Sequence, residues 1–120
     1  MTLQECYAAM GGDYAGVTSR LPTERMVQKF VLKFLNDGSY DLLVRSMEAE
    51  DYAEAFRAAH TIKVVCQNLG FTVLYQSSSQ LSEALRSGFT PEAPALAEQV
   101  AVDYKQTVEA IRTYQTSNGL

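Results

Sequence analysis

The stretch Asp51–Gly70, DYAEAFRAAHTIKVVCQNLG, decides the fold. At about 100° per residue, its small and apolar side chains gather on one side, which predicts one long amphipathic helix. The stripe that would face the core consists of Ala55, Ala59, Ile62, Val65, Cys66 and Leu69. Gly70 is suited to end this helix, because glycine readily takes the left-handed conformation found just beyond a helix C-terminus.

The only histidine of the protein, His60, lies on this helix and well away from the stripe. Lys63, Val64 and Gln67 follow it at helical spacing, and Phe56 precedes it by one turn, so the five side chains share one face. This spacing predicts an exposed patch that combines an imidazole, an ammonium and an amide with apolar neighbours. A single histidine on a polar helix face is usually just a solvated side chain, and that interpretation stays open.

The rest of the chain is also helical in pattern, and no segment alternates with the period of two that is typical of strands. Helices are expected over residues 2–10, 23–36, 40–49, 72–87 and 93–113, with a connector over 11–22 and a frayed tail over 116–120. Four longer helices with short connections favour an all-α, antiparallel up-and-down four-helix bundle with additional short N-terminal helices. The length of 120 residues suits one domain, residues 1–120.

Composition excludes several classes of protein. The chain is 47% hydrophobic and 20% charged, as in ordinary globular proteins, and its net charge of −4 argues against a nucleic-acid-binding surface. No apolar run approaches the roughly 18 residues of a membrane span, and the N-terminus lacks the pattern of a signal peptide. We therefore expect a cytoplasmic protein that does not bind membranes. Two cysteines and one histidine give no zinc-binding spacing, so we expect no bound metal or cofactor.

The patch around His60 suits phosphoryl chemistry. Imidazole is largely neutral at the pH of the cytoplasm, so a ring nitrogen can attack an electrophile. Lys63 could offset the charge of an arriving phosphoryl group, and Gln67 could donate a hydrogen bond to it. No serine or acidic partner completes a hydrolase triad, and no glycine-rich loop could hold a nucleotide, so a self-acting hydrolase ranks last. This arrangement is typical of a protein whose chemistry is completed by the active site of a partner.

The segment Ala59–Lys63, AHTIK, followed by Asn68–Phe71, NLGF, resembles the histidine-containing phosphotransfer (HPt) domain. The resemblance extends to the all-helical pattern over nearly the whole chain. It implies that His60 accepts a phosphoryl group from a phospho-aspartate of a receiver domain and passes it on, with Lys63 and Gln67 assisting. The receiver would supply the acidic pocket and Mg²⁺, so no independent catalysis is expected of this chain.

One residue departs from the family pattern, which usually has glycine where this chain has Val64. A branched side chain beside the imidazole either slows transfer or makes it more selective, or it provides an apolar contact for one adapted partner. Phe56 and Val64 are candidate docking contacts, since an apolar patch with a polar rim often marks an interface. The family also tends to place a polar side chain on the next helix, within hydrogen-bonding reach of the histidine. Gln80 and Ser82 are the candidates here.

Two other functions stay open at this point. The first is a degenerate HPt-like module that binds receiver domains or another signalling partner without taking a phosphoryl group. The second is a helical bundle that associates through a different face. The implied partners are receiver domains of response regulators and a hybrid sensor kinase, with no nucleic acid. We expect a monomer. The particular receivers, the direction of phosphate flow, the pathway output, and whether the chain is free-standing or a domain of a larger protein are not predicted.

Overall fold

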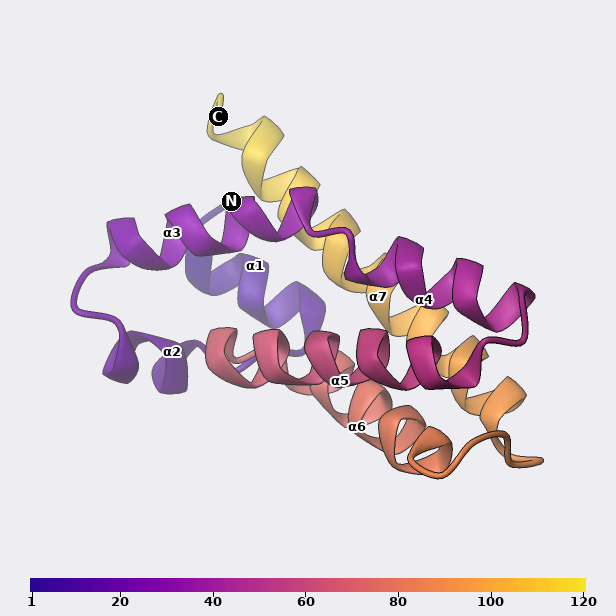
Figure 1. The fold of residues 1–120 in the computed structure, drawn as a ribbon. Helices are drawn as coiled ribbons and strands as arrows, with labels where there is room; N and C mark the ends of the chain where they lie inside the picture. Colours follow the sequence, from indigo (N-terminus) through magenta and orange to yellow (C-terminus); the bar gives the residue numbers. More distant parts are fainter.

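The computed structural model describes residues 1–120 and consists of helices without any strand, which confirms the predicted all-α class. Figure 1 shows the arrangement of the elements. They are α1 (Leu3–Met10), α2 (Tyr14–Arg20), α3 (Glu24–Lys33), the 3₁₀ turn η1 (Phe34–Asn36), α4 (Ser39–Glu48), α5 (Tyr52–Leu69), α6 (Thr72–Leu85) and α7 (Ala93–Ser117). None of these helices combines the length and the apolar character that crossing a membrane requires.

Consecutive long helices pack against one another in the order α4, α5, α6 and α7. Helix α1 lies against α7, while α3 touches both α5 and α7. Figure 1 shows α3 and α4 following one another along the same side of the molecule, with α7 crossing behind them. The ring of Tyr40, at the start of α4, stacks on Tyr104 of α7 with the ring centroids 3.9 Å apart. This stack connects α4 with α7, the first and last of the four helices that pack in order.

Helix α5, which carries His60, has a well-defined cap at each end. The carboxylate of Asp51 accepts a hydrogen bond of 3.2 Å from the backbone N–H of Glu54, one of the donors that a helix N-terminus leaves unpaired. At the other end Gly70 has a φ of 72°, as expected of a left-handed cap. A Cβ atom at Gly70 would also lie 2.8 Å from the carbonyl oxygen of Asp13, so glycine is needed on two grounds.

The N-terminal segment covers the end of the α5–α6 hairpin. The hydroxyl of Tyr7 in α1 donates a hydrogen bond of 2.6 Å to the carbonyl of Leu69. The backbone N–H of Asp13 donates to the carbonyl of Gly70 at 2.7 Å, and Arg20 donates to two further carbonyls in the last turn of α5. These bonds provide partners for carbonyl groups that have none within the helix.

Small side chains contribute to the core in both α5 and α6. Those that are buried are Ala55, Ala58 and Ala59 in α5 and Ser77, Ser78 and Ser82 in α6. The hydroxyl of Ser78 donates to the carbonyl of Leu74 at 2.7 Å, so it is satisfied within its own helix. The packing of α5 against α6 is the most extensive in the molecule. Small residues permit this close approach of two backbones.

The prediction of an irregular connector over residues 11–22 is wrong, because α2 forms there. Its start is set by Asp13, whose carboxylate accepts a hydrogen bond of 3.0 Å from the backbone N–H of Gly16. Val17 is fully buried and attaches the helix to the core. A seven-residue helix with one buried anchor leaves too short an apolar repeat for the period to be read from the sequence.

Several predicted helix ends also differ from the structure. The helix expected over 23–36 ends at Lys33 and tightens into η1, and the helix expected over 40–49 begins one residue earlier, at Ser39. Gly38 occupies the N-cap position of α4, and the backbone N–H of Ser39 donates a hydrogen bond of 2.8 Å to the carboxylate of Asp37. Helix α6 stops at Leu85, before the predicted end at residue 87, and α7 extends past residue 113 to Ser117.

Candidate functional site

The side chain of His60 is exposed, and the residue lies near the middle of α5, well away from both ends of the helix. No protein group forms a hydrogen bond or an ion pair with its imidazole. The ring lies beside that of Phe56, one turn earlier, with the ring centroids 6.0 Å apart and the planes at 20°. Both ring nitrogens are therefore free of protein hydrogen-bond partners, and the side chain is open to a molecule that arrives from solvent.

The other predicted residues of α5 surround the imidazole as expected from their spacing. Lys63 is half-buried and forms no ion pair, so its ammonium is free of a carboxylate partner. The side chain of Gln67 is exposed and unbonded. Val64 is 40% exposed, an unusual degree of exposure for a large apolar residue of this protein. The structure thus brings an imidazole, an ammonium, an amide and an apolar side chain together on one face of α5.

The two residues predicted to reach His60 from the next helix behave differently from one another. Gln80 is exposed on α6 and its side chain forms no hydrogen bond. Ser82 is fully buried, and its hydroxyl has no hydrogen-bond partner. The hydrogen bond that we predicted from α6 to the imidazole is therefore not formed in this structure by either residue. Ser82 points into the packed interior and not to the exposed face.

Sequence reasoning missed an ion pair at the C-terminal end of α6, which lies next to this face. Arg86 donates two hydrogen bonds to the carboxylate of Glu83, at 3.1 and 2.9 Å. Its guanidinium also lies over the ring of Phe56, with 5.6 Å from the guanidinium carbon to the ring centroid. Hydrogen bonding and charge from Arg86 lower the pKa of Glu83, and Lys63 contributes a smaller effect in the same direction. In an antiparallel hairpin, residues equally far from the turn face one another. This rule could have predicted that Arg86 lies near Phe56.

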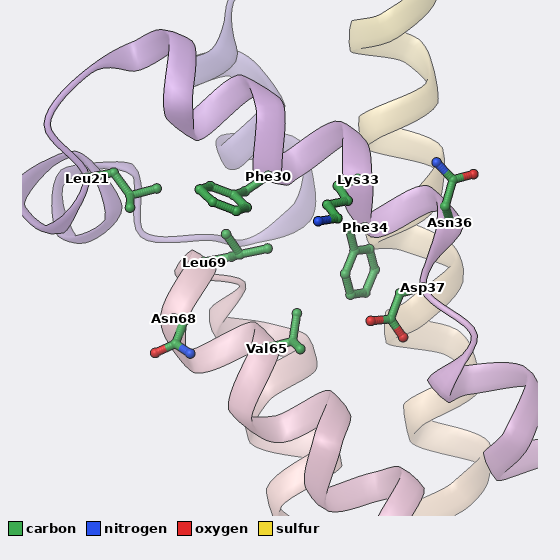
Figure 2. Close-up of a pocket in the computed structure, with 9 residues that line it drawn as sticks. All are labelled: Leu21, Phe30, Lys33, Phe34, Asn36, Asp37, Val65, Asn68 and Leu69. Atoms are coloured by element: carbon green, nitrogen blue, oxygen red, sulfur yellow. The ribbon is translucent and has the colours of Figure 1, made fainter.

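A mostly apolar cavity elsewhere on the protein does not contain any of these residues. It has a volume of about 580 Å³ and lies between the α3–η1 segment and the second half of α5, as Figure 2 shows. Its walls are mostly apolar, with Lys33 and Asp37 among its polar members. The lining residues are Leu21, Phe30, Lys33, Phe34, Asn36, Asp37, Val65, Asn68 and Leu69. His60 stands outside it, on an open surface of the same helix.

Both cysteines are buried in the core, away from the exposed face of α5. Burial raises the pKa of the Cys6 thiol to about 11, and it raises the pKa of Cys66 further, with a smaller contribution from the carboxylate of Asp37. Both thiols therefore stay protonated, and they behave as small apolar side chains. No group of three or more histidine, cysteine, aspartate or glutamate side chains is placed to hold a metal ion.

The fold and this face define an all-helical domain that presents one histidine to solvent. The family model of the Hpt domain matches residues 26–114, which include all of α4, α5 and α6 and most of α7. The chain therefore belongs to the Hpt domain family, and the predicted resemblance is confirmed. Neither a curated protein nor a solved structure shows a significant match to the chain. Hpt domains in general take part in phosphotransfer in phosphorelays and interact with receiver domains.

Proposed function

We propose that this protein is a phosphorelay intermediate whose His60 accepts a phosphoryl group from a receiver-domain phospho-aspartate and returns it to another receiver. One observation carries the proposal. Within the region that matches the Hpt family, the imidazole of His60 is exposed and free of protein partners, one turn from the unpaired ammonium of Lys63. A nucleophile that is held in the open suits a reaction that is completed by a second protein.

In the proposed step the lone pair of one ring nitrogen of His60 attacks the phosphorus atom. A nitrogen–phosphorus bond forms while the bond between phosphorus and the aspartate oxygen breaks, and the aspartate leaves as a carboxylate. The second ring nitrogen keeps its proton, so no proton needs to be removed before the attack. The reverse reaction returns the phosphoryl group to a receiver aspartate, so the same surface serves both directions.

Three residues of the exposed face have supporting roles in this proposal. Lys63 acts as a mobile positive charge that offsets the charge of the phosphoryl group, and Gln67 donates a hydrogen bond to it. Phe56 contributes to docking, since an apolar surface beside a polar reacting group favours association with a matching partner surface. Mg²⁺ belongs to the acidic pocket of the receiver, and this chain is proposed to bind no cofactor of its own.

The scaffold that we infer for this reaction is an antiparallel four-helix bundle. Its first member is the α3–η1–α4 segment, broken near Gly38, and the others are α5, α6 and α7. Packing of each helix on the next and the stack of Tyr40 on Tyr104 support this arrangement. We further propose that the protein acts as a monomer in the cytoplasm, with receiver domains and a hybrid sensor kinase as partners.

The proposal is tested by incubating the protein with a phosphorylated receiver domain and Mg²⁺. The expected product carries a label that is labile in acid and stable in alkali, as a phosphohistidine is. The His60→Gln variant should fold normally, because the side chain is exposed, and it should take no label. Label that persists in this variant would assign the acceptor to a different residue.

A second experiment tests the role of Lys63 in transfer and checks folding by a separate measurement. Lys63→Ala should slow transfer without changing the unfolding midpoint, since the ammonium has no partner in the protein. Lys105→Ala on α7 is the control, because it removes the same charge from an exposed position of another helix. Equal transfer rates in the wild type and in Lys63→Ala would remove the proposed role of Lys63.

A second candidate function is supported by the exposure of Val64 beside the imidazole. In this alternative the domain binds a receiver but takes no phosphoryl group, because the branched side chain keeps the acidic pocket from closing over the ring. It predicts a stable complex without label in the wild type. Val64→Ala and Val64→Gly should then restore labelling, and Ala separates the steric effect from the helix destabilisation of about 1 kcal/mol that glycine causes.

A further inference from the structure

A carboxylate in the last turn of α6 and a guanidinium just beyond its end lie beside the face that carries His60. Arg86 is bound to Glu83 by two hydrogen bonds, and both side chains remain largely exposed, at 54% and 67%. The guanidinium lies over the ring of Phe56, and the other neighbour of that ring is the imidazole of His60. An arginine held this way is close to the site, and a carboxylate occupies one pair of its donors, Nε and Nη2, with which it could bind an anion.

The geometry points to Arg86 as a second phosphate-binding cation of this site, which is held by Glu83 until His60 is phosphorylated and then exchanges the carboxylate for the phosphoryl group. This inference rests on the proposed phosphorylation of His60. Neither residue needs to contact the imidazole before the reaction. The exchange involves a rotation of two exposed side chains, Glu83 in the last turn of α6 and Arg86 just beyond its end.

Charge explains why the exchange would favour the phosphorylated state. A phosphoryl group adds nearly two negative charges and three strong acceptor oxygens. A guanidinium binds such a group with two parallel hydrogen bonds, as it binds a carboxylate, but the phosphoryl group carries the larger charge. Glu83 and the phosphoryl group would repel one another, so the movement of Arg86 to the phosphoryl group also relieves a contact between like charges. Arg86 would thereby act as a positioning and stabilising residue.

A second arginine near His60 is placed less favourably. Arg57 lies three residues before His60 on α5, but its guanidinium donates two hydrogen bonds to Glu54, one turn further from the histidine. The guanidinium of Arg57, unlike that of Arg86, does not lie over the ring of Phe56. Arg57 is therefore a good comparison, since it has the same chemistry, a similar ion pair and a position close in the sequence.

The experiment measures the equilibrium of phosphoryl transfer between this protein and one receiver domain. The transfer equilibrium constant is the ratio of phosphorylated to free protein, divided by the same ratio for the receiver. It depends only on the free energies of the separate species. Contacts that exist only in the complex change the rate of transfer but not this constant. A change in the constant therefore reports on the phosphohistidine itself, and a merely structural or docking role of Arg86 would leave it unchanged.

We expect Arg86→Ala to lower this constant about two- to fivefold, the range of an exposed ion pair. Glu83→Gln should raise it by a similar factor, because the arginine is then free and the repulsion is gone. The matched control is Arg45→Ala on α4, which removes an arginine from the exposed ion pair with Asp41 and should leave the constant unchanged. A decrease with Arg57→Ala and none with Arg86→Ala would overturn the inference.

A direct readout uses phosphoramidate, a small donor that phosphorylates histidine without any receiver. Phosphorylation of His60 should shift the NMR signals of the Arg86 guanidinium and leave those of Arg45 in place. The exchange alone is refuted if His60 is phosphorylated but two things stay unchanged. These are the Arg86 signals of the wild type and the transfer constant of Arg86→Ala relative to the wild type. Wild-type protein that takes no phosphate from either donor refutes the proposed function, and the exchange with it.

Discussion

Replacing Tyr7 with phenylalanine removes one oxygen atom from the core and should destabilise the helix that carries His60. The Tyr7 hydroxyl donates a hydrogen bond of 2.6 Å to the carbonyl of Leu69, in the last turn of α5. No backbone N–H donates to that carbonyl, because it lies at the end of the helix. Phenylalanine keeps the ring and its contacts with the rings of Tyr14 and Phe71, so the change tests the hydrogen bond alone.

The expected loss follows from the burial of this bond. Tyr7 is fully buried, so water cannot replace the hydroxyl without entering the core. Leaving a buried acceptor without a partner costs about 1–3 kcal/mol. For a chain of this length, each kcal/mol lowers the melting temperature by roughly 4 °C. Tyr7→Phe should therefore lower the melting temperature by several degrees, although no charge and no apolar contact is lost.

The measurements are thermal unfolding, for the melting temperature, and urea unfolding, for the midpoint concentration, both followed by helical circular dichroism. The matched control is Tyr14→Phe, since Tyr14 is half-buried, packs against Tyr7, and its hydroxyl forms no hydrogen bond. We expect the midpoint to decrease for Tyr7→Phe and to stay within error for Tyr14→Phe, with equal slopes of the transitions. Equal midpoints for wild type and Tyr7→Phe would show that the bond to Leu69 contributes no net stability.

The other predictions concern backbone conformation and the buried thiols. Gly70→Ala should cost more than about 1 kcal/mol in unfolding free energy, since its positive φ disfavours a Cβ that would also meet the carbonyl of Asp13. Gly38→Ala is the control, with open space around the new atom; equal losses in the two variants would contradict this account. Cys6 and Cys66 should not react with a thiolate-selective reagent at a pH near ~8.5, where an exposed thiol is half ionised, until the protein is unfolded. Rapid labelling of the native protein would mean that the core opens more readily than the packing implies.

Much of the fold could be predicted because its long helices carry strong periodic signals. The α5 stripe, the closing Gly70 and the exposure of His60 all follow from the spacing of residues along one helix. Pro94 likewise marks the first turn of α7, where a missing backbone N–H has no consequence. These features depend on neighbours within a few positions of the sequence, so a single helix period is enough to derive them.

The features that could not be predicted depend on contacts between segments. Helix α2 is anchored by one buried valine, and its start depends on the single carboxylate of Asp13. The burial of Ser82 depends on the rotation of α6 about its own axis, which no repeat in the sequence specifies with certainty. A shift of one residue in that register exchanges a core position for a surface position, and this explains why both Gln80 and Ser82 were candidates.

The same register determines which charges of α6 come close to His60. Helices α5 and α6 pack against one another extensively, with small alanines and serines among their buried residues, and side chains at the edge of that contact are brought together across it. Arg86 lies over Phe56 as a result, although thirty positions separate them in the sequence. A bulkier residue at Ala59 would therefore do more than strain the core. It would separate Arg86 from the imidazole, so it should lower the transfer constant in the same direction as Arg86→Ala while His60 itself stays exposed.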